Sequence, residues 1–217
     1  MDTTTDDVKS FETETTEQLV ALVRDEGALP GEREAACWEL YRRQDRRAVP
    51  ALIAALKSRH STVATTAACA LFAFTSKRAV KPLIAALRGA VAWETRCAAA
   101  ITLLGMGDER AISPLVKTLN DTCEQVDVRG QAAKSLGSLL DRDSVPEGVR
   151  TAILRNLEDP APEVRFWCAY ALSQFGDGSV IPHLRRVADD PARVARWRTV
   201  GEEANWAISV LQSSTTY

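Results

Sequence analysis

Apolar and small residues recur at helical spacing through most of the chain, in pairs of segments that are separated by short polar turns. The central example runs from Ser144 to Asp177, and its second segment extends from Val164 to Phe175. Within that segment the apolar positions lie three or four residues apart, which is typical of a helix with one buried face. The stretch therefore predicts a helix, a turn and a second helix.

The second segment recurs in the frame V-R-x-x-A-A-x-A-L. Its copies begin at Glu32, Val63, Thr95, Val128, Val164 and Val200, at intervals of 31, 32, 33, 36 and 36 residues. The first segment also repeats, and in several copies an apolar pair precedes a proline, which a first helical turn tolerates. The pattern predicts six helical pairs: 14–26 with 32–43, 47–58 with 61–75, 78–89 with 92–106, 110–120 with 124–140, 144–157 with 161–175, and 179–189 with 192–212.

The period and the motif together resemble the HEAT repeat, in particular the short bacterial form called the PBS-lyase HEAT-like repeat. The residues that carry the resemblance are Asp159-Pro160, Glu163-Val164-Arg165 and the closing Gly176-Asp177, and it covers roughly residues 31–212. It implies an all-α, right-handed α-solenoid of about six HEAT-like pairs, a fold used mostly as a binding scaffold.

In this family, acids and arginines in the turns between paired helices stack into a ladder that ties adjacent repeats. The resemblance implies that role here for Asn120, Asp121 and Asp159 together with Arg129 and Arg165. The first pair lacks the proline and the Val-Arg start, and the last carries extra residues, 191–199. Atypical terminal repeats are expected where a solenoid is capped.

The domain organisation follows from this frame: an acidic flexible tail over 1–13, one repeat domain over 14–212 and a flexible tail over 213–217. The polar, acidic start lacks the basic and apolar regions of a signal peptide, and no apolar run approaches the ~18 residues of a membrane span. The five cysteines show no metal-ligand spacing, which favours reduced thiols and a cytoplasmic location.

Charge and motifs exclude several kinds of chemistry. Residues 1–17 hold six acids and one lysine, so the remainder has 26 basic and 23 acidic residues, too even a balance to favour nucleic acid as a partner. Only His60 and His183 occur, without ligands at metal spacing, and the paired His-Glu dipeptides of HEAT-like deoxyhypusine hydroxylases are absent. No phosphate-binding glycine motif is present. The sequence therefore predicts neither an enzyme nor a cofactor.

The positions that the repeat leaves free predict a partner surface. They lie on the helical face opposite the core, and in a HEAT-like solenoid the second helices line the concave side. Aromatic residues there are favoured interface anchors. Lys134, Glu202 and Glu203 are expected to give polar selectivity. The predicted partner-binding set is Trp38, Ile101, Gln131, Lys134, Phe166, Trp167, Tyr170, Gln174, Glu202, Glu203 and Trp206.

Alternatives stay open at this stage. The rings of the fifth and sixth pairs either form a groove for another protein or are buried as cap core. A second function is that of a bilin lyase or its chaperone-like subunit, after which the repeat is named. A third is a nucleic-acid binder or a HEAT-like DNA glycosylase, with phosphates held and bases stacked by C-terminal residues. Those residues are Arg185, Arg186, Arg193, Arg196, Trp197 and Arg198.

Overall fold

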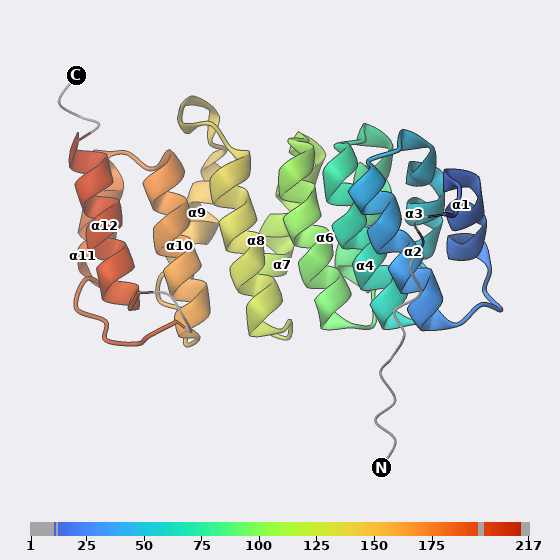
Figure 1. The fold of residues 1–217 in the computed structure, drawn as a ribbon. Coiled ribbons are helices and arrows are strands. Elements are labelled where there is room, and N and C mark those ends of the chain that lie inside the picture. Colours follow the sequence, from blue (N-terminus) through green and yellow to red (C-terminus); the bar gives the residue numbers. More distant parts are fainter. Residues whose placement is uncertain (1–10, 12, 195–197, 214–217) are drawn as a thin grey trace, which may run out of the picture. The chain divides into compact units, whose positions relative to one another are not determined.

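The computed structural model describes residues 11, 13–194 and 198–213, except for the side chain of Asp143. In this range the chain forms α-helices joined by turns and short 3-10 helices (Figure 1). The only extended pairing among these residues is an isolated bridge between Arg193 and Thr199. The all-α class predicted from the sequence is confirmed.

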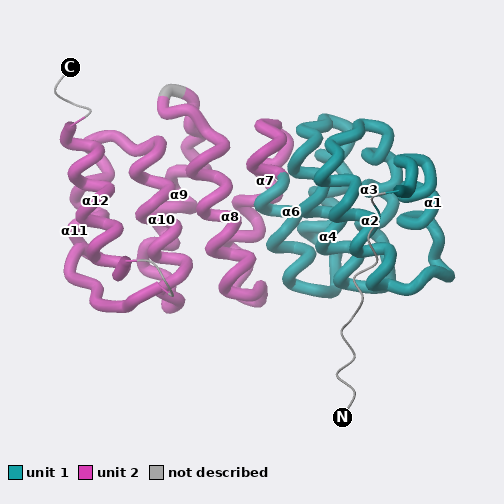
Figure 2. The backbone as a smooth tube through the Cα atoms, in the orientation of Figure 1, with its two compact units in different colours: residues 1–102 teal, residues 103–217 magenta. Residues whose placement is uncertain are grey.

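Two compact units divide the chain, residues 1–102 and residues 103–217 (Figure 2). The division falls inside one helix, so the prediction of a single repeat domain over 14–212 stays a prediction. The first unit contains α1 (Thr16–Arg24), α2 (Pro30–Arg43), α3 (Val49–Ala55), α4 (Ser61–Leu71), α5 (Val80–Gly89) and most of α6 (Trp93–Met106). The second contains α7 (Ile112–Asn120), α8 (Val126–Leu139), α9 (Glu147–Asn156), α10 (Pro162–Phe175), α11 (Ile181–Arg185) and α12 (Val200–Ser213).

Each unit has two layers of helices, as the repeat frame predicts. In the first unit α1 packs on α2, α3 packs on α4, and α2 and α4 lie side by side. In the second unit α8, α10 and α12 lie side by side as one layer, and α7, α9 and α11 form the other (Figure 1). Six helical pairs follow one another along the chain.

Local signals set the starts of the helices. Thr15 caps α1, because its hydroxyl accepts from the Gln18 N–H while the Gln18 side chain accepts from the Thr15 N–H. Three of the connections between pairs begin with an aspartate whose carboxylate accepts from a backbone N–H two residues on, as in Asp108 with Arg110 at 3.0 Å. These caps satisfy backbone donors that a helix end leaves unpaired.

Small residues bring the second helices of the C-terminal unit close together. A Cβ added to Gly137 of α8 would lie 2.7 Å from the Cα of Ala171 on α10. Ala132, Ala133 and Ala169 are fully buried along the same pair of helices. The alanine positions of the repeat therefore serve close helix packing, as the sequence predicts.

Part of the predicted arginine ladder is present in the second unit, whereas Asp121, an expected member, is exposed and accepts from the Cys123 N–H. Arg129 forms a buried ion pair with Asp159 of the next repeat, and it also donates to the Leu119 carbonyl at 3.1 Å and to Asn156 at 3.1 Å. Arg165 repeats the arrangement one step further, with its Nε 2.8 Å from Asp190. Each arginine thus ties its own turn to the following one.

One predicted helix boundary is wrong, and the predicted bounds of the N-terminal tail stay a prediction. The last helix, expected from residue 192, begins at Val200, because Thr199 and Glu202 form a capping box there. The N-terminal tail, expected over 1–13, lies outside the described residues except at its end. There Phe11 is buried, and its carbonyl accepts a 2.6 Å hydrogen bond from Arg43. Residue 213 is the last of α12, and 214–217 lie outside the described residues.

Candidate functional site: an aromatic cavity in the C-terminal unit

A cavity of 280 Å³ opens on the layer formed by α8, α10 and α12. One lining residue comes from α8, three from α10 and three from the start of the last helix and the residues before it. They are Lys134, Phe166, Trp167, Tyr170, Arg198, Glu203 and Trp206. Six of these seven belong to the predicted partner-binding set, so the structure brings the C-terminal part of that set together.

The aromatic rings of α10 form a continuous cluster. The ring centroids of Phe166 and Trp167 are 5.0 Å apart, and those of Trp167 and Tyr170 are 5.6 Å apart, both in edge-to-face geometry. Such pairs contribute about 0.5–1.5 kcal/mol beyond the area that they bury. The cluster therefore holds these rings in fixed positions, a feature that favours binding by lowering its entropic cost.

Two cations lie over ring faces at the cavity. The Nζ of Lys134 is 4.4 Å from the centroid of a Trp167 ring, and the Cζ of Arg198 is 5.2 Å from that of Trp206. A cation over the face of an aromatic ring is attracted by its quadrupole. The cavity thus combines apolar ring surface with two positive charges at its edge.

Phe166 and Glu203 differ from their predicted placement on an exposed face. Phe166 is only 2% exposed and Glu203 only 3%, so both lie beneath the surface. Trp167, Tyr170 and Trp206 remain half-buried. The reason is that α12 packs against α10, so the side chains between the two helices are covered. Some rings are therefore core and others line an open cavity.

The Glu203 carboxyl is a buried acid at the bottom of this largely aromatic cavity, here called its floor. Burial raises its pKa above the ordinary value of 4.5, and the positive charge of Arg198 partly opposes that change. The closest approach of the pair, from Arg198 Nε to Glu203 Oε2, is 3.7 Å. These two atoms are therefore too far apart for an ordinary hydrogen bond.

The position of the Trp167 ring depends on Gly130, a residue that the sequence reasoning did not single out. A Cβ added to Gly130 of α8 would lie 3.0 Å from Cδ1 of Trp167. The signal was available, because Gly130 stands at a free position of the repeat frame where the other copies carry a side chain.

Other members of the predicted set have local partners. Gln131 donates to Ser135 at 3.2 Å and Gln174 donates to Ser173 at 2.9 Å, each within its own helix. Glu202 is exposed and accepts from the Thr199 N–H at 2.6 Å as part of the capping box. These three residues are not among those that line the cavity.

Trp38 and Ile101 belong to the first unit. Trp38 is 47% exposed and packs edge-to-face on Tyr41 with a centroid distance of 5.7 Å. Ile101 is also exposed. They form no part of the aromatic cavity of the second unit.

The predicted anion surface is divided among different partners. Arg186 pairs with Glu158 at 2.8 Å, whereas Arg198 lies over Trp206 in the cavity. Arg185 and Arg193 are exposed, and Arg196 and Trp197 lie outside the described residues. The described arginines therefore do not share one phosphate-binding arrangement.

None of the five cysteines forms a disulfide. Cys37 and Cys168 are buried, whereas Cys123 is exposed. Burial raises the pKa of Cys37 to about 12. In the described part of the chain, no three His, Cys, Asp or Glu side chains gather closely enough to hold a metal ion.

None of the helices described has the length and apolar character needed to cross a bilayer.

Comparison with known proteins identifies the class. The family of HEAT repeats matches residues 16–93, 80–147 and 124–201, so the chain belongs to the HEAT repeat family. No curated protein matches the chain. The predicted membership of the HEAT repeat family and the predicted all-α solenoid class are confirmed.

Solved structures show the same fold. A complex of CpcE and CpcF of phycocyanin lyase from Nostoc sp. PCC7120 is similar with a TM-score of 0.64 and 25% identity, over 86% of this chain and 75% of that one. A designed armadillo repeat protein has a TM-score of 0.57 and 17% identity, over 89% and 99%. Human deoxyhypusine hydroxylase has a TM-score of 0.52 and 16% identity, over 93% and 89%.

Proposed function

We propose that this HEAT repeat protein is a non-catalytic recognition module that binds another protein through the aromatic cavity of its C-terminal unit. The observation that carries the proposal is the convergence of Trp167, Tyr170 and Trp206 around one opening, with Lys134 and Arg198 over ring faces. Tryptophan, tyrosine and arginine are the residues most enriched among interface hot spots.

The lining of the cavity supports a protein segment as its ligand. The buried Glu203 carboxyl offers an acceptor at the floor, so a partner side chain that carries an apolar stem and a positive end matches the lining. The rings would supply contact area and the acid would supply selectivity.

The test compares two aromatic pairs. The intact chain, a Trp167→Ala, Tyr170→Ala variant and a Trp38→Ala, Tyr41→Ala control are used to capture proteins from lysate, which mass spectrometry then identifies. We expect one partner to be retained by the wild type and the control and lost by the cavity variant. Circular dichroism verifies that all three fold. A partner retained equally by all three would place recognition elsewhere.

A second candidate function is that of a subunit of a bilin lyase, and the similarity to the phycocyanin lyase complex favours it. In that case the chain would bind a tetrapyrrole or a second lyase subunit. Titration of the purified protein with a bilin provides the test, because a bound chromophore changes its absorption. An unchanged spectrum at saturating bilin would argue against chromophore binding and leave protein recognition as the proposal.

A further inference from the structure

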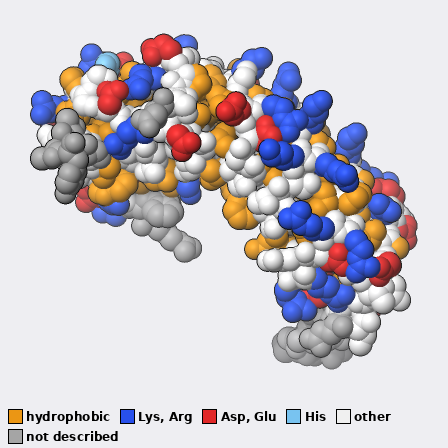
Figure 3. All heavy atoms as spheres, turned by 90° about the horizontal axis from the view of Figure 1, so that it is seen from above, with side chains coloured by type: hydrophobic (Ala, Val, Ile, Leu, Met, Phe, Trp, Pro, Cys, Tyr) orange, Lys and Arg blue, Asp and Glu red, His pale blue; other side chains and the backbone are white. Residues whose placement is uncertain are grey.

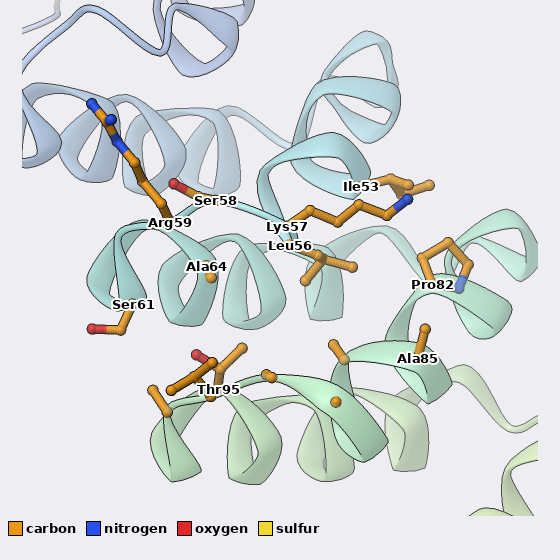
Figure 4. A pocket seen from close by; sticks show the side chains of 15 residues that line it. Ile53, Leu56, Lys57, Ser58, Arg59, Ser61, Ala64, Pro82, Ala85 and Thr95 are labelled. Atoms are coloured by element: carbon orange, nitrogen blue, oxygen red, sulfur yellow. The ribbon is translucent and has the colours of Figure 1, made fainter.

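A second and larger cavity lies in the first unit. It has a volume of 740 Å³ and opens between the α3–α4 hairpin and the α5–α6 hairpin (Figure 4). Ile53, Leu56 and Pro82 give it apolar walls, and the fully exposed Val91 lies at its edge. None of its lining residues belongs to the aromatic cavity, so it requires a separate explanation.

The cavity lies where the repeat lacks an arginine. The second position of the frame is arginine in four of the six copies, Arg33, Arg96, Arg129 and Arg165. In the second copy Val63 is followed by Ala64, which lines the cavity. The remaining exception is Gly201, in the last pair.

The other copies show what the missing side chain would do. Arg165 donates to the carbonyl of Asp159 in its own turn at 2.7 Å and reaches Asp190 of the following turn at 2.8 Å. Here the following turn, residues 89–92, contains no acid. Both members of the ladder contact are therefore absent, and the space that they fill elsewhere is open.

The stretch of sequence that contains all the lining residues is strongly basic. Residues 46–102 hold nine lysines and arginines and a single acid, Glu94, a formal charge of +8. Figure 3 shows many Lys and Arg side chains on the exposed face of this unit. Lys57 and Arg59 line the cavity; Lys57 lies extended beside Ile53, whereas the Arg59 guanidinium points away from Ala64 (Figure 4). The positive ends of α4 and α6 add to this field, because both helices begin at the cavity.

We infer that this cavity binds an acidic segment of a partner protein, with an aliphatic side chain inserted between α3 and α5, a carboxylate facing Lys57 and further acids attracted by the basic stretch around it. Charge complementarity selects the acidic partner. The apolar walls favour a peptide over a nucleic acid. Sequence-tolerant binding of single strands relies on stacked aromatic rings, and none of the lining residues described is aromatic.

The test uses a fluorescein-labelled peptide in which a leucine is flanked by runs of glutamate. Its affinity for the full chain is measured by fluorescence anisotropy. The decisive variant is Ala64→Arg, which restores the arginine of the repeat and fills the cavity while it adds a positive charge. We expect this variant to fold and to bind the peptide at least about tenfold more weakly than the wild type. Attraction by charge alone would instead become stronger.

Two further variants separate the cavity from net charge. Lys57→Glu with Arg59→Glu should also lose about tenfold in affinity. Lys117→Glu with Arg155→Glu makes the same change of charge on exposed positions of the second unit and should bind as the wild type does. A peptide with glutamine in place of glutamate should bind weakly to every variant.

Several results would overturn the inference. One is equal or tighter binding by Ala64→Arg, which would indicate diffuse electrostatic attraction. Another is tighter binding of a single-stranded oligonucleotide than of the peptide. A third is concentration-dependent dimerisation that Ala64→Arg abolishes, because residues 1–45 of a second copy carry a charge of −7 and would then be the ligand. Absence of peptide binding at low salt would also refute it.

Discussion

The two units use the same repeat frame and differ at the contact between successive turns. In the second unit Arg129 and Asp159 fill that contact as a buried pair. In the first unit Arg33 is likewise buried, but the next copy has Ala64 and no acid in the following turn, and a cavity of 740 Å³ lies there. The proposed peptide site therefore lies where both members of the contact are absent.

The largest loss of stability is expected when the buried pair of Arg129 and Asp159 is broken. Arg129→Ala leaves the Asp159 carboxylate buried without its partner, because the Arg129 and Asp159 side chains are each only 5% exposed. Removal of one member of a buried pair costs about 3–5 kcal/mol. The free energy of unfolding in urea measures the loss.

The matched control is Arg186→Ala, which removes an ion pair whose side chains are 63% and 66% exposed. Exposed pairs contribute about 0–1 kcal/mol, so this variant should unfold close to the wild type. Similar losses in both variants would mean that Arg129 and Asp159 do not hold the second unit together.

The next comparison is between a buried and a half-buried ring of the aromatic cavity. Phe166→Ala removes a buried ring and should cost about 3–5 kcal/mol of stability. Trp167→Ala removes a half-buried ring, so it should cost less stability. Its loss of partner affinity should be roughly 2 kcal/mol or more. Urea unfolding and a binding assay with the captured partner measure the two quantities, and the same ranking in both assays would contradict the assignment.

A smaller effect concerns the packing of α8 on α10. Gly137→Ala places a Cβ against the backbone of Ala171, where overpacking typically costs about 1–3 kcal/mol. Gly148→Ala, in α9, meets no atom within 4 Å and should stabilise the protein by about 0.5–1 kcal/mol through helix propensity. Opposite shifts in the thermal midpoint are expected, and shifts of the same sign would contradict the packing argument.

Much of the fold was predictable, because its repeat period and apolar spacing are local properties of the sequence. Every helical pair follows from the frame, and the family resemblance implies a ladder that includes Arg129 and Asp159. The pairing of Arg129 with the acid of the next repeat was not predicted, because it depends on how successive turns stack. The start of the last helix was missed, although Thr199 and Glu202 carry the spacing of a capping box. The prediction followed the repeat spacing instead of this capping motif, and so placed the start of the helix at residue 192.

The site was predictable only in part. The free positions of the frame identify Trp167, Tyr170 and Trp206, because a repeat leaves a regular face without core residues. They do not distinguish Phe166, which α12 covers, since the packing of one pair on the next depends on where each helix starts. The basic cavity was missed because charge was counted over all residues after 17 together, which hides the +8 of residues 46–102.

The smallest predicted effect is a pH dependence that arises from Glu203 at the floor of the aromatic cavity. Burial raises the pKa of this carboxyl in the folded protein above 4.5, so the folded state holds its proton at pH values where the unfolded chain has lost it. Stability is therefore gained as pH falls through the folded-state pKa, and the ionised carboxylate destabilises the protein at neutral pH. Glu203→Gln should raise the thermal midpoint at pH 7, with an advantage that shrinks as pH falls towards 4.5. Thermal unfolding of both proteins across this range measures the difference, and an advantage that grows towards acid would show that Arg198 holds the carboxylate in its charged form.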